Sequence, residues 1–78
     1  MGMADVTRAF SRGLGAKGTC NASAMTYEND EQGKRSLNRL TFNVMTPAGT
    51  PALVSEVFPA SDDPVAKAHE MGSAFTGD

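Results

Sequence analysis

LNRLTFNVMTPAGTPALVSEVF, residues 37–58, is the stretch that decides the fold. Its first half alternates: Leu40, Phe42 and Val44 point to one side of an extended chain, and polar residues point to the other. This pattern predicts a half-buried strand over residues 36–46. Pro47 and Gly49 then supply the backbone angles of a tight turn, and residues 52–58 return as a second strand. The stretch therefore predicts a β-hairpin.

A helix start follows the hairpin. Pro59 ends the last strand. The segment Ser61-Asp-Asp-Pro64 follows, in which Asp63 is placed to cap a helix whose first residue is Pro64. Apolar residues then recur at helical spacing, at Val65, Ala68, Met71 or Gly72, and Phe75. We expect one C-terminal helix, closed by Gly77, that packs across one face of the sheet.

The first third of the chain is less regular. Residues 5–14 fit one face of a helix, with Asp5 as a possible N-cap, but they also alternate as an edge strand would. The helix is the favoured interpretation. The glycine-rich residues 13–18 read as a loop, and residues 19–27 as a strand with a face of small residues, namely Cys20, Ala22, Ala24 and Thr26. Close packing of the C-terminal helix on that face is expected.

The predicted fold class is therefore α+β: a small antiparallel sheet of three or four strands with a C-terminal helix packed on one face. A short N-terminal helix joins it if residues 5–14 are helical. The polar residues 28–34 would form the loop of a further hairpin. At 78 residues the chain is expected to form a single compact domain, residues 1–78, with residues 1–4 as a disordered tag or start. Domains of this size often gain stability by dimerisation.

Targeting features are sparse. Cys20 is the single cysteine, so no internal disulfide can form, and no charged leader precedes a long apolar run. We expect a cytoplasmic protein. No window approaches the roughly 20 apolar residues that a membrane span needs.

The net charge is −2, which argues against a general nucleic-acid coat. The charge is uneven, because basic residues outnumber acidic ones up to Val54 and acidic ones dominate beyond it. This distribution predicts a dipolar molecule with an acidic helical side and a more basic opposite side.

No catalytic, metal or cofactor site is expected. Gly13-x-Gly15-x-x-Gly18 matches a dinucleotide pattern, but it leads into a strand and lacks the βαβ context, so a plain loop with Lys17 as a surface cation is the better interpretation. His69 is the sole histidine and has no second ligand at metal-binding spacing. Cys20 is interpreted as an inert packing residue. The protein is expected not to be an enzyme.

A basic corner remains, formed by Lys34, Arg35 and Arg39 at the start of the strand 36–46. One interpretation is a solvated loop that neutralises its own acids. The other is a β-ribbon that contacts phosphate, with Asn38 as a possible base reader. Tyr27 is the only aromatic residue placed to stack nearby, whereas proteins that bind single strands present several.

Two functional hypotheses follow. The first is a small non-catalytic interaction protein that binds and modulates or inhibits a larger protein or ribonucleoprotein complex, of the kind that phages and mobile elements encode. Its hairpin-then-helix order resembles the architecture of some small anti-CRISPR proteins, although no residue motif specific to them is present. The alternative is a small nucleic-acid-binding module that uses the basic hairpin. A homodimer through an exposed strand edge is compatible with both. The candidate partner-binding residues are Lys17, Lys34, Arg35, Arg39, Asn43, Glu56 and Asp63.

Overall fold

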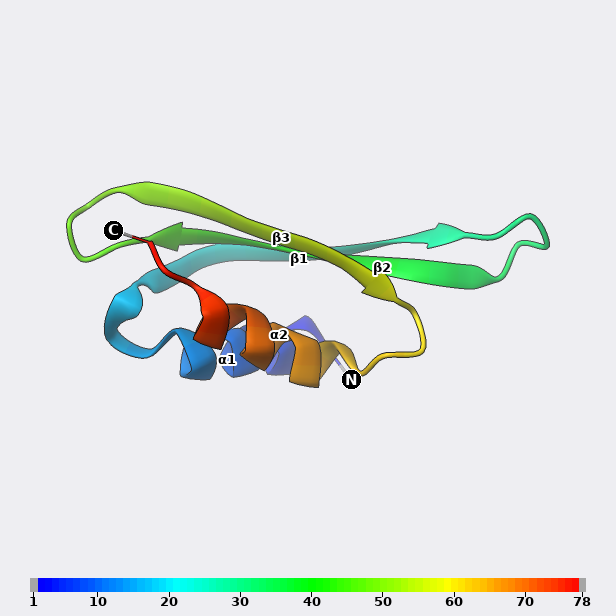
Figure 1. Cartoon of the computed structure of the whole chain (residues 1–78), viewed down its shortest axis with the longest axis horizontal. Coiled ribbons are helices and arrows are strands. Elements are labelled where there is room, and N and C mark those ends of the chain that lie inside the picture. The colour runs from blue at the N-terminus through cyan, green and yellow to red at the C-terminus, as the bar shows by residue number, and fades with distance from the viewer. Residues whose placement is uncertain (1, 78) are drawn as a thin grey trace.

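Two helices lie side by side under one face of a three-stranded antiparallel sheet in the computed structural model, which describes residues 2–77 (Figure 1). The strand order is β1-β2-β3, and each strand pairs with the next in sequence. This arrangement confirms the predicted α+β class, with three strands and with the N-terminal helix. The elements are α1 (Met3–Leu14), the 3₁₀ turn η1 (Gly15–Lys17), β1 (Thr19–Asn29), β2 (Arg35–Met45), β3 (Pro51–Pro59) and α2 (Pro64–Ala74).

The core lies between the helices and the central strand. β2 buries Leu40, Phe42 and Val44, as its alternation predicts. The rings of Phe10 on α1 and Phe42 on β2 stack in parallel, with centroids 3.9 Å apart and an interplanar angle of 2°. Stacked rings add to the apolar area that both side chains bury, so this pair joins the first helix to the sheet.

The ambiguity at residues 5–14 is resolved as a helix. Val6, Phe10 and Leu14 recur at intervals of four residues and are all buried. The helix begins earlier than expected, at Met3, with Gly2 at the N-cap, so Asp5 lies in the first turn and does not cap. Within residues 1–4, the expectation of a disordered start is therefore wrong for the helical Met3 and Ala4, while Met1 lies outside the described residues.

Glycines set the distance between the two helices. A Cβ atom at Gly72 of α2 would collide with the backbone carbonyl of Phe10 and would lie 2.8 Å from the amide nitrogen of Leu14. A Cβ atom at Gly13 of α1 would collide with the carbonyl of His69. The predicted loop over residues 13–18 is corrected accordingly, because Gly13 is helical and the 3₁₀ turn follows it. Glycine thus occupies the positions at which the backbones of α1 and α2 are in direct contact.

β1 contains an irregularity that changes which face its residues occupy. The register with β2 shifts between Cys20 and Ala22, so Cys20 pairs with Val44 on the helix side while Ala22 and Ala24 lie on the opposite face. The prediction that one small-residue face packs against the C-terminal helix is therefore wrong. The helix that lies against β1 is α1, and the Thr7 hydroxyl is 2.7 Å from the Ser23 hydroxyl.

α2 starts as predicted and ends differently. The Asp63 carboxylate accepts a hydrogen bond from the Val65 amide (3.0 Å), and Pro64 is the first helical residue. Such a cap satisfies one of the amides that the first turn leaves unpaired. The helix ends at Ala74 with Phe75 at the C-cap, so Gly77 does not close it.

Candidate interaction surface

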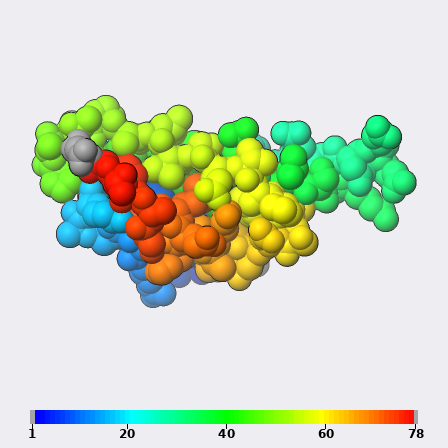
Figure 2. All heavy atoms as spheres, viewed as in Figure 1, coloured from blue at the N-terminus to red at the C-terminus, as the bar shows by residue number. Residues whose placement is uncertain are grey.

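The hairpin between β1 and β2 projects beyond the helices, and we call its residues 28–36 the arm. The described molecule measures 46 × 19 × 18 Å, and the arm forms one end of the long axis (Figures 1 and 2). All nine arm residues are exposed. Because neither helix extends beneath it, the arm adds nothing to the core.

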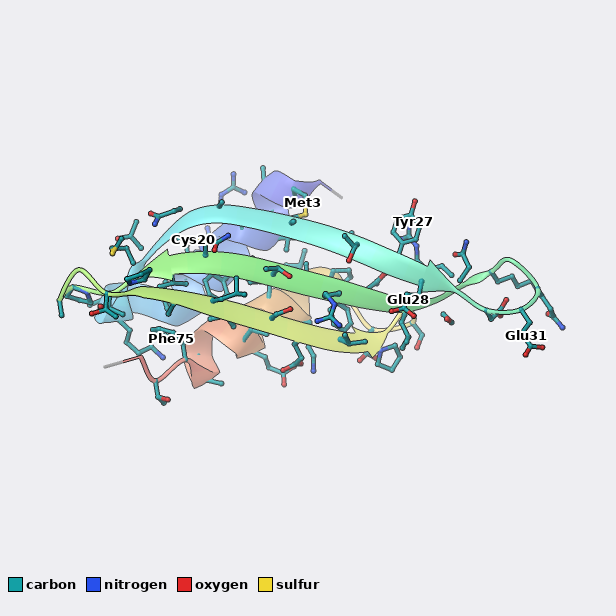
Figure 3. The ribbon with its side chains drawn as sticks, turned by 90° about the horizontal axis from the view of Figure 1, so that it is seen from above. Met3, Cys20, Tyr27, Glu28, Glu31 and Phe75 are labelled. Carbon is teal, nitrogen blue, oxygen red and sulfur yellow. The ribbon has the colours of Figure 1, made fainter. Side chains whose placement is uncertain are left out.

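The turn at the end of the arm is nevertheless fixed by hydrogen bonds. The Asp30 carboxylate accepts from the amides of Gln32 (2.8 Å) and Lys34 (3.0 Å), and the Asp30 amide donates to the Lys34 carbonyl (2.7 Å). Gly33 takes a positive φ of 79° that favours glycine. An aspartate that bonds the backbone ahead of it is a common means of fixing a turn. Glu31 lies at the far tip of this turn (Figure 3).

The base of the arm carries a second fixed contact. The Arg35 guanidinium lies over the Tyr27 ring, 3.8 Å from its centroid, and the ring remains 55% exposed. A guanidinium over an aromatic face is an attractive arrangement that orients both side chains. The pair thus presents an aromatic ring and a cation together at the point where the arm leaves the body.

The arm mixes charges of both signs. It carries three acids, Glu28, Asp30 and Glu31, beside the two bases Lys34 and Arg35. The predicted separation of a basic side from an acidic one is therefore not present here. The sequence interpretation of a loop whose bases face its own acids stays open, and of the acids Glu31 lies at the tip and Glu28 at the base (Figure 3).

A second exposed surface is the face of the sheet that points away from the helices, which we call the open face. On it, the Arg39 guanidinium donates to the Ser55 hydroxyl (3.1 Å), which also lies 3.2 Å from the Thr41 hydroxyl. Asn43 lies exposed on the same face. From the strand registers, the open face consists of Thr19, Ala22, Ala24, Thr26, Glu28, Leu37, Arg39, Thr41, Asn43, Met45, Pro51, Leu53, Ser55, Val57 and Pro59.

Three of the candidate partner-binding residues hold or adjoin α2. Asp63 caps α2. The Glu56 carboxylate pairs with the Lys67 ammonium at 2.7 Å, and this hydrogen bond raises the pKa of Lys67. The Lys17 ammonium donates to three backbone carbonyls at the C-terminal end of α2. The other four candidates are divided between the arm, with Lys34 and Arg35, and the open face, with Arg39 and Asn43.

Lys17 closes the C-terminal end of α2, and its removal should destabilise the fold. Its ammonium donates to the carbonyls of Gly72 (3.1 Å), Ser73 (2.8 Å) and Phe75 (2.8 Å). A cation at this end of a helix satisfies unpaired carbonyls and favours the helix dipole. We expect Lys17→Met to lower the free energy of unfolding by about 1–2 kcal/mol in urea titrations. Lys34→Met, on the exposed arm, is the control and should change it little; equal effects would contradict the capping role.

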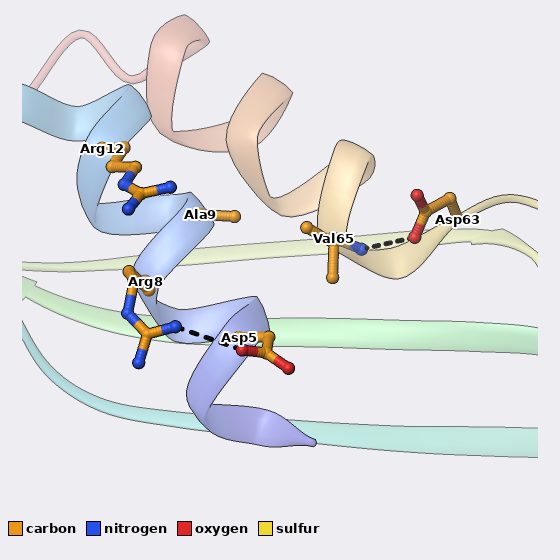
Figure 4. A pocket seen from close by; sticks show the side chains of 6 residues that line it. All are labelled: Asp5, Arg8, Ala9, Arg12, Asp63 and Val65. Carbon is orange, nitrogen blue, oxygen red and sulfur yellow. Dashed lines mark hydrogen bonds and ion pairs between the residues drawn. The ribbon is translucent and has the colours of Figure 1, made fainter. Parts of the chain in front are cut away.

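A shallow depression between the two helices is the other feature of note (Figure 4). Its charged side chains are largely engaged with each other or with the backbone: Arg8 pairs with Asp5 at 3.1 Å, and Asp63 bonds Val65. Arg12 and Ala9 complete the lining. The depression therefore presents acidic and basic side chains together and no cluster of like charges.

Asn38 and Cys20, which were considered from the sequence for base reading and for chemistry, lie outside the arm and the open face. Asn38 is only 2% exposed, and its Oδ1 atom accepts no hydrogen bond from residues 2–77, so it cannot read a base. Burial raises the pKa of the Cys20 thiol, which donates to the Ala22 carbonyl (3.5 Å), and a raised pKa disfavours the reactive thiolate.

The described part of the chain contains no group of three or more potential metal ligands. None of the helices between residues 2 and 77 is long and apolar enough to cross a bilayer. Comparison of the chain with models of protein families, with curated proteins and with solved structures found no match.

Proposed function

We propose that this chain is a small non-catalytic interaction protein that binds a larger macromolecular complex through its arm and modulates or inhibits it. The observation that carries the proposal is the arm itself: nine exposed residues that contribute nothing to the core, yet are held in one shape by the Asp30 turn. The turn sets the register of β1 and β2, and it also holds the arm in one shape for a partner.

A fixed protrusion suits binding in a groove. Ordering a flexible loop on binding lowers affinity, and a hairpin that is already ordered avoids most of that loss. The arm offers an aromatic ring with a cation at its base, at Tyr27 and Arg35, and carboxylates at its tip. Aromatic and arginine side chains are the residues that most often dominate protein–protein interfaces.

Charge favours a protein surface as the partner, either alone or within a ribonucleoprotein complex. The arm carries three acids against two bases, Lys17 is bonded to α2, and Arg39 is bonded to Ser55 on the open face. Affinity for nucleic acid rises with the number of free cations that reach phosphate, so this set is a poor one. The specific form of the proposal is inhibition of a host defence complex, because the small size and the hairpin-then-helix order resemble those of some small anti-CRISPR proteins.

Affinity capture from cells of the source organism or its host, with and without nuclease, tests the proposal. We expect the tagged full chain to retain one stoichiometric protein or complex in both conditions. The variant Tyr27→Ala/Glu31→Ala/Arg35→Ala should lose it without a change in thermal unfolding, whereas Pro47→Ala/Thr50→Ala, in the β2–β3 turn at the opposite end, should retain it. Capture that disappears with nuclease would instead support a nucleic-acid-binding module.

A further inference from the structure

The open face carries most of the large apolar side chains that are exposed between residues 2 and 77. Between residues 2 and 77 four large apolar side chains are exposed, and three of them lie on this face: Met45 (37%), Leu53 (65%) and Val57 (38%). Figure 1 shows that both helices lie on the opposite side of the sheet. Exposed apolar residues gathered on one face typically mark an interaction site.

From this face we propose that two copies of the chain associate by stacking their open faces, with a two-fold axis parallel to the strands, so that both arms point the same way. The inference is independent of what the arm binds. It commits the open face to a second copy and leaves residues 29–36 of each arm free.

Side-chain size near Leu53 favours contact with a second copy of the same face. One edge strand, β3, presents the tall residues Leu53 and Val57, while the other, β1, presents the short residues Ala22 and Ala24. A two-fold axis along the strands lays β3 of each copy over β1 of the other. The registers then place Leu53 of each copy over Ala22 of the other, so that a tall side chain of the face meets one of its shortest, as close packing of two sheets requires.

The charges of the face allow a second copy to stack on it. Its two charged residues, Arg39 and Glu28, have opposite signs, so the face has no net charge to repel a second copy. Arg39 leans towards β3, where its guanidinium bonds Ser55 at 3.1 Å. In the stacked pair β3 lies under β1 of the other copy, which carries Glu28. The registers place Ser55 level with Thr41 and Glu28 level with Leu37, so the two charged groups lie at different points along the strands, and the charge argument is the neutrality of the face.

Pairing through strand edges is obstructed, which leaves the face as the better route. Figure 3 shows α2 reaching past the edge of β3 and α1 reaching past the edge of β1. Neighbouring strands lie about 4.8 Å apart, whereas packed helices need about 8–10 Å between their axes. A two-fold pair of β3 edges would force the two α2 helices together. Stacked faces have no helix between them.

The area of the open face sets the expected affinity of the dimer. Three strands about 4.8 Å apart, with about nine residues each at about 3.3 Å per residue, cover roughly 400 Å² in projection. Two such faces bury close to the ~1,000 Å² at which specific interfaces begin. We therefore expect a dimer with a micromolar or weaker dissociation constant.

Sedimentation equilibrium of the full chain from micromolar to about millimolar concentration tests the dimer. Leu53→Asp should weaken association at least about tenfold. Tyr27→Asp, which changes the one large exposed apolar residue that residues 2–77 carry outside the open face, should leave association unchanged. Arg39→Glu and Glu28→Arg should each weaken it, and the double variant should recover it. A monomer at every concentration, or equal effects of Leu53→Asp and Tyr27→Asp, would overturn the proposal.

The direction of the arms is tested by spin labels at Gln32→Cys in a Cys20→Ser background, measured by double electron–electron resonance. With sheets about 10 Å apart and aligned within about 30°, parallel arms place the labels roughly 10–30 Å apart. Arms at opposite ends of the pair would separate the labels by more than the 46 Å length of one chain. The longer distance would overturn the parallel arrangement.

Discussion

Gly72→Ala should lower the free energy of unfolding by about 2–3 kcal/mol and the melting temperature by roughly 10–20 °C. The added Cβ atom would collide with the Phe10 carbonyl and lie 2.8 Å from the Leu14 amide nitrogen, both of them backbone atoms that no rotamer change can move. In an exposed helix the same substitution stabilises by about 0.5–1 kcal/mol, so the sign of the effect reports the helix contact.

Differential scanning calorimetry measures this effect, with Ala66→Ser as the control. Ala66 is exposed on the same helix, and its replacement should change stability by less than about 0.5 kcal/mol. Gly13→Ala, on the facing helix, should behave like Gly72→Ala because its Cβ atom would collide with the His69 carbonyl. A stabilising Gly72→Ala would show that α1 and α2 do not pack through their backbones.

Phe42→Ala should remove most of the stability of the fold. Phe42 is fully buried and stacks on Phe10 with 3.9 Å between ring centroids. Truncating a buried phenylalanine costs about 3–5 kcal/mol, while a chain of this length has a total of only about 4–12 kcal/mol. We expect a partly unfolded protein with a weak, broad transition in urea, followed by circular dichroism.

Phe42→Leu separates loss of volume from loss of the ring. It should cost less than Phe42→Ala because leucine refills part of the cavity. The Phe10→Leu/Phe42→Leu double variant measures the ring-on-ring contribution as the part that is not additive. A Phe42→Ala protein that unfolds cooperatively within about 1 kcal/mol of the unchanged chain would contradict the packing described here.

Much of the fold was predictable because local chemistry and packing agree. The alternation around Phe42 identified β2, and Asp63 followed by Pro64 identified the start of α2. Both signals come from residues that lie within a few positions of one another in the sequence. The helical interpretation of residues 5–14 was also favoured correctly, although the competing strand pattern has the same apolar residues.

The predictions fail where the role of a residue is set by contact with an element that is distant in the sequence. The shift between Cys20 and Ala22 reverses the faces of β1, and nothing in the composition of that strand indicates where the shift occurs. The role of Gly72 depends on a facing helix 60 residues earlier in the chain, as the role of Lys17 depends on the end of α2. Sequence spacing alone cannot reveal such contacts.

The partner-binding role of the seven candidate residues stays a prediction, and the structure shows only where they lie. Lys34, Arg35, Arg39 and Asn43 are exposed as expected, whereas Lys17, Glu56 and Asp63 serve the fold. The projection of the arm could not be read from the sequence, because it depends on how far the helices reach beneath the sheet. Asp30 and Gly33 did signal a turn, and their hydrogen bonds make that turn a fixed one.

Photo-crosslinking from the arm tests the central claim most directly. A photoreactive amino acid would replace Gln32, next to the tip, in one variant and Ala48, in the turn at the opposite end of the molecule, in the other. The proposal predicts that irradiation in cells of the source organism or its host links Gln32 to one predominant protein and leaves Ala48 without that adduct. Adducts of the same protein at equal yield from both positions, or a nucleic-acid adduct in place of a protein, would contradict it.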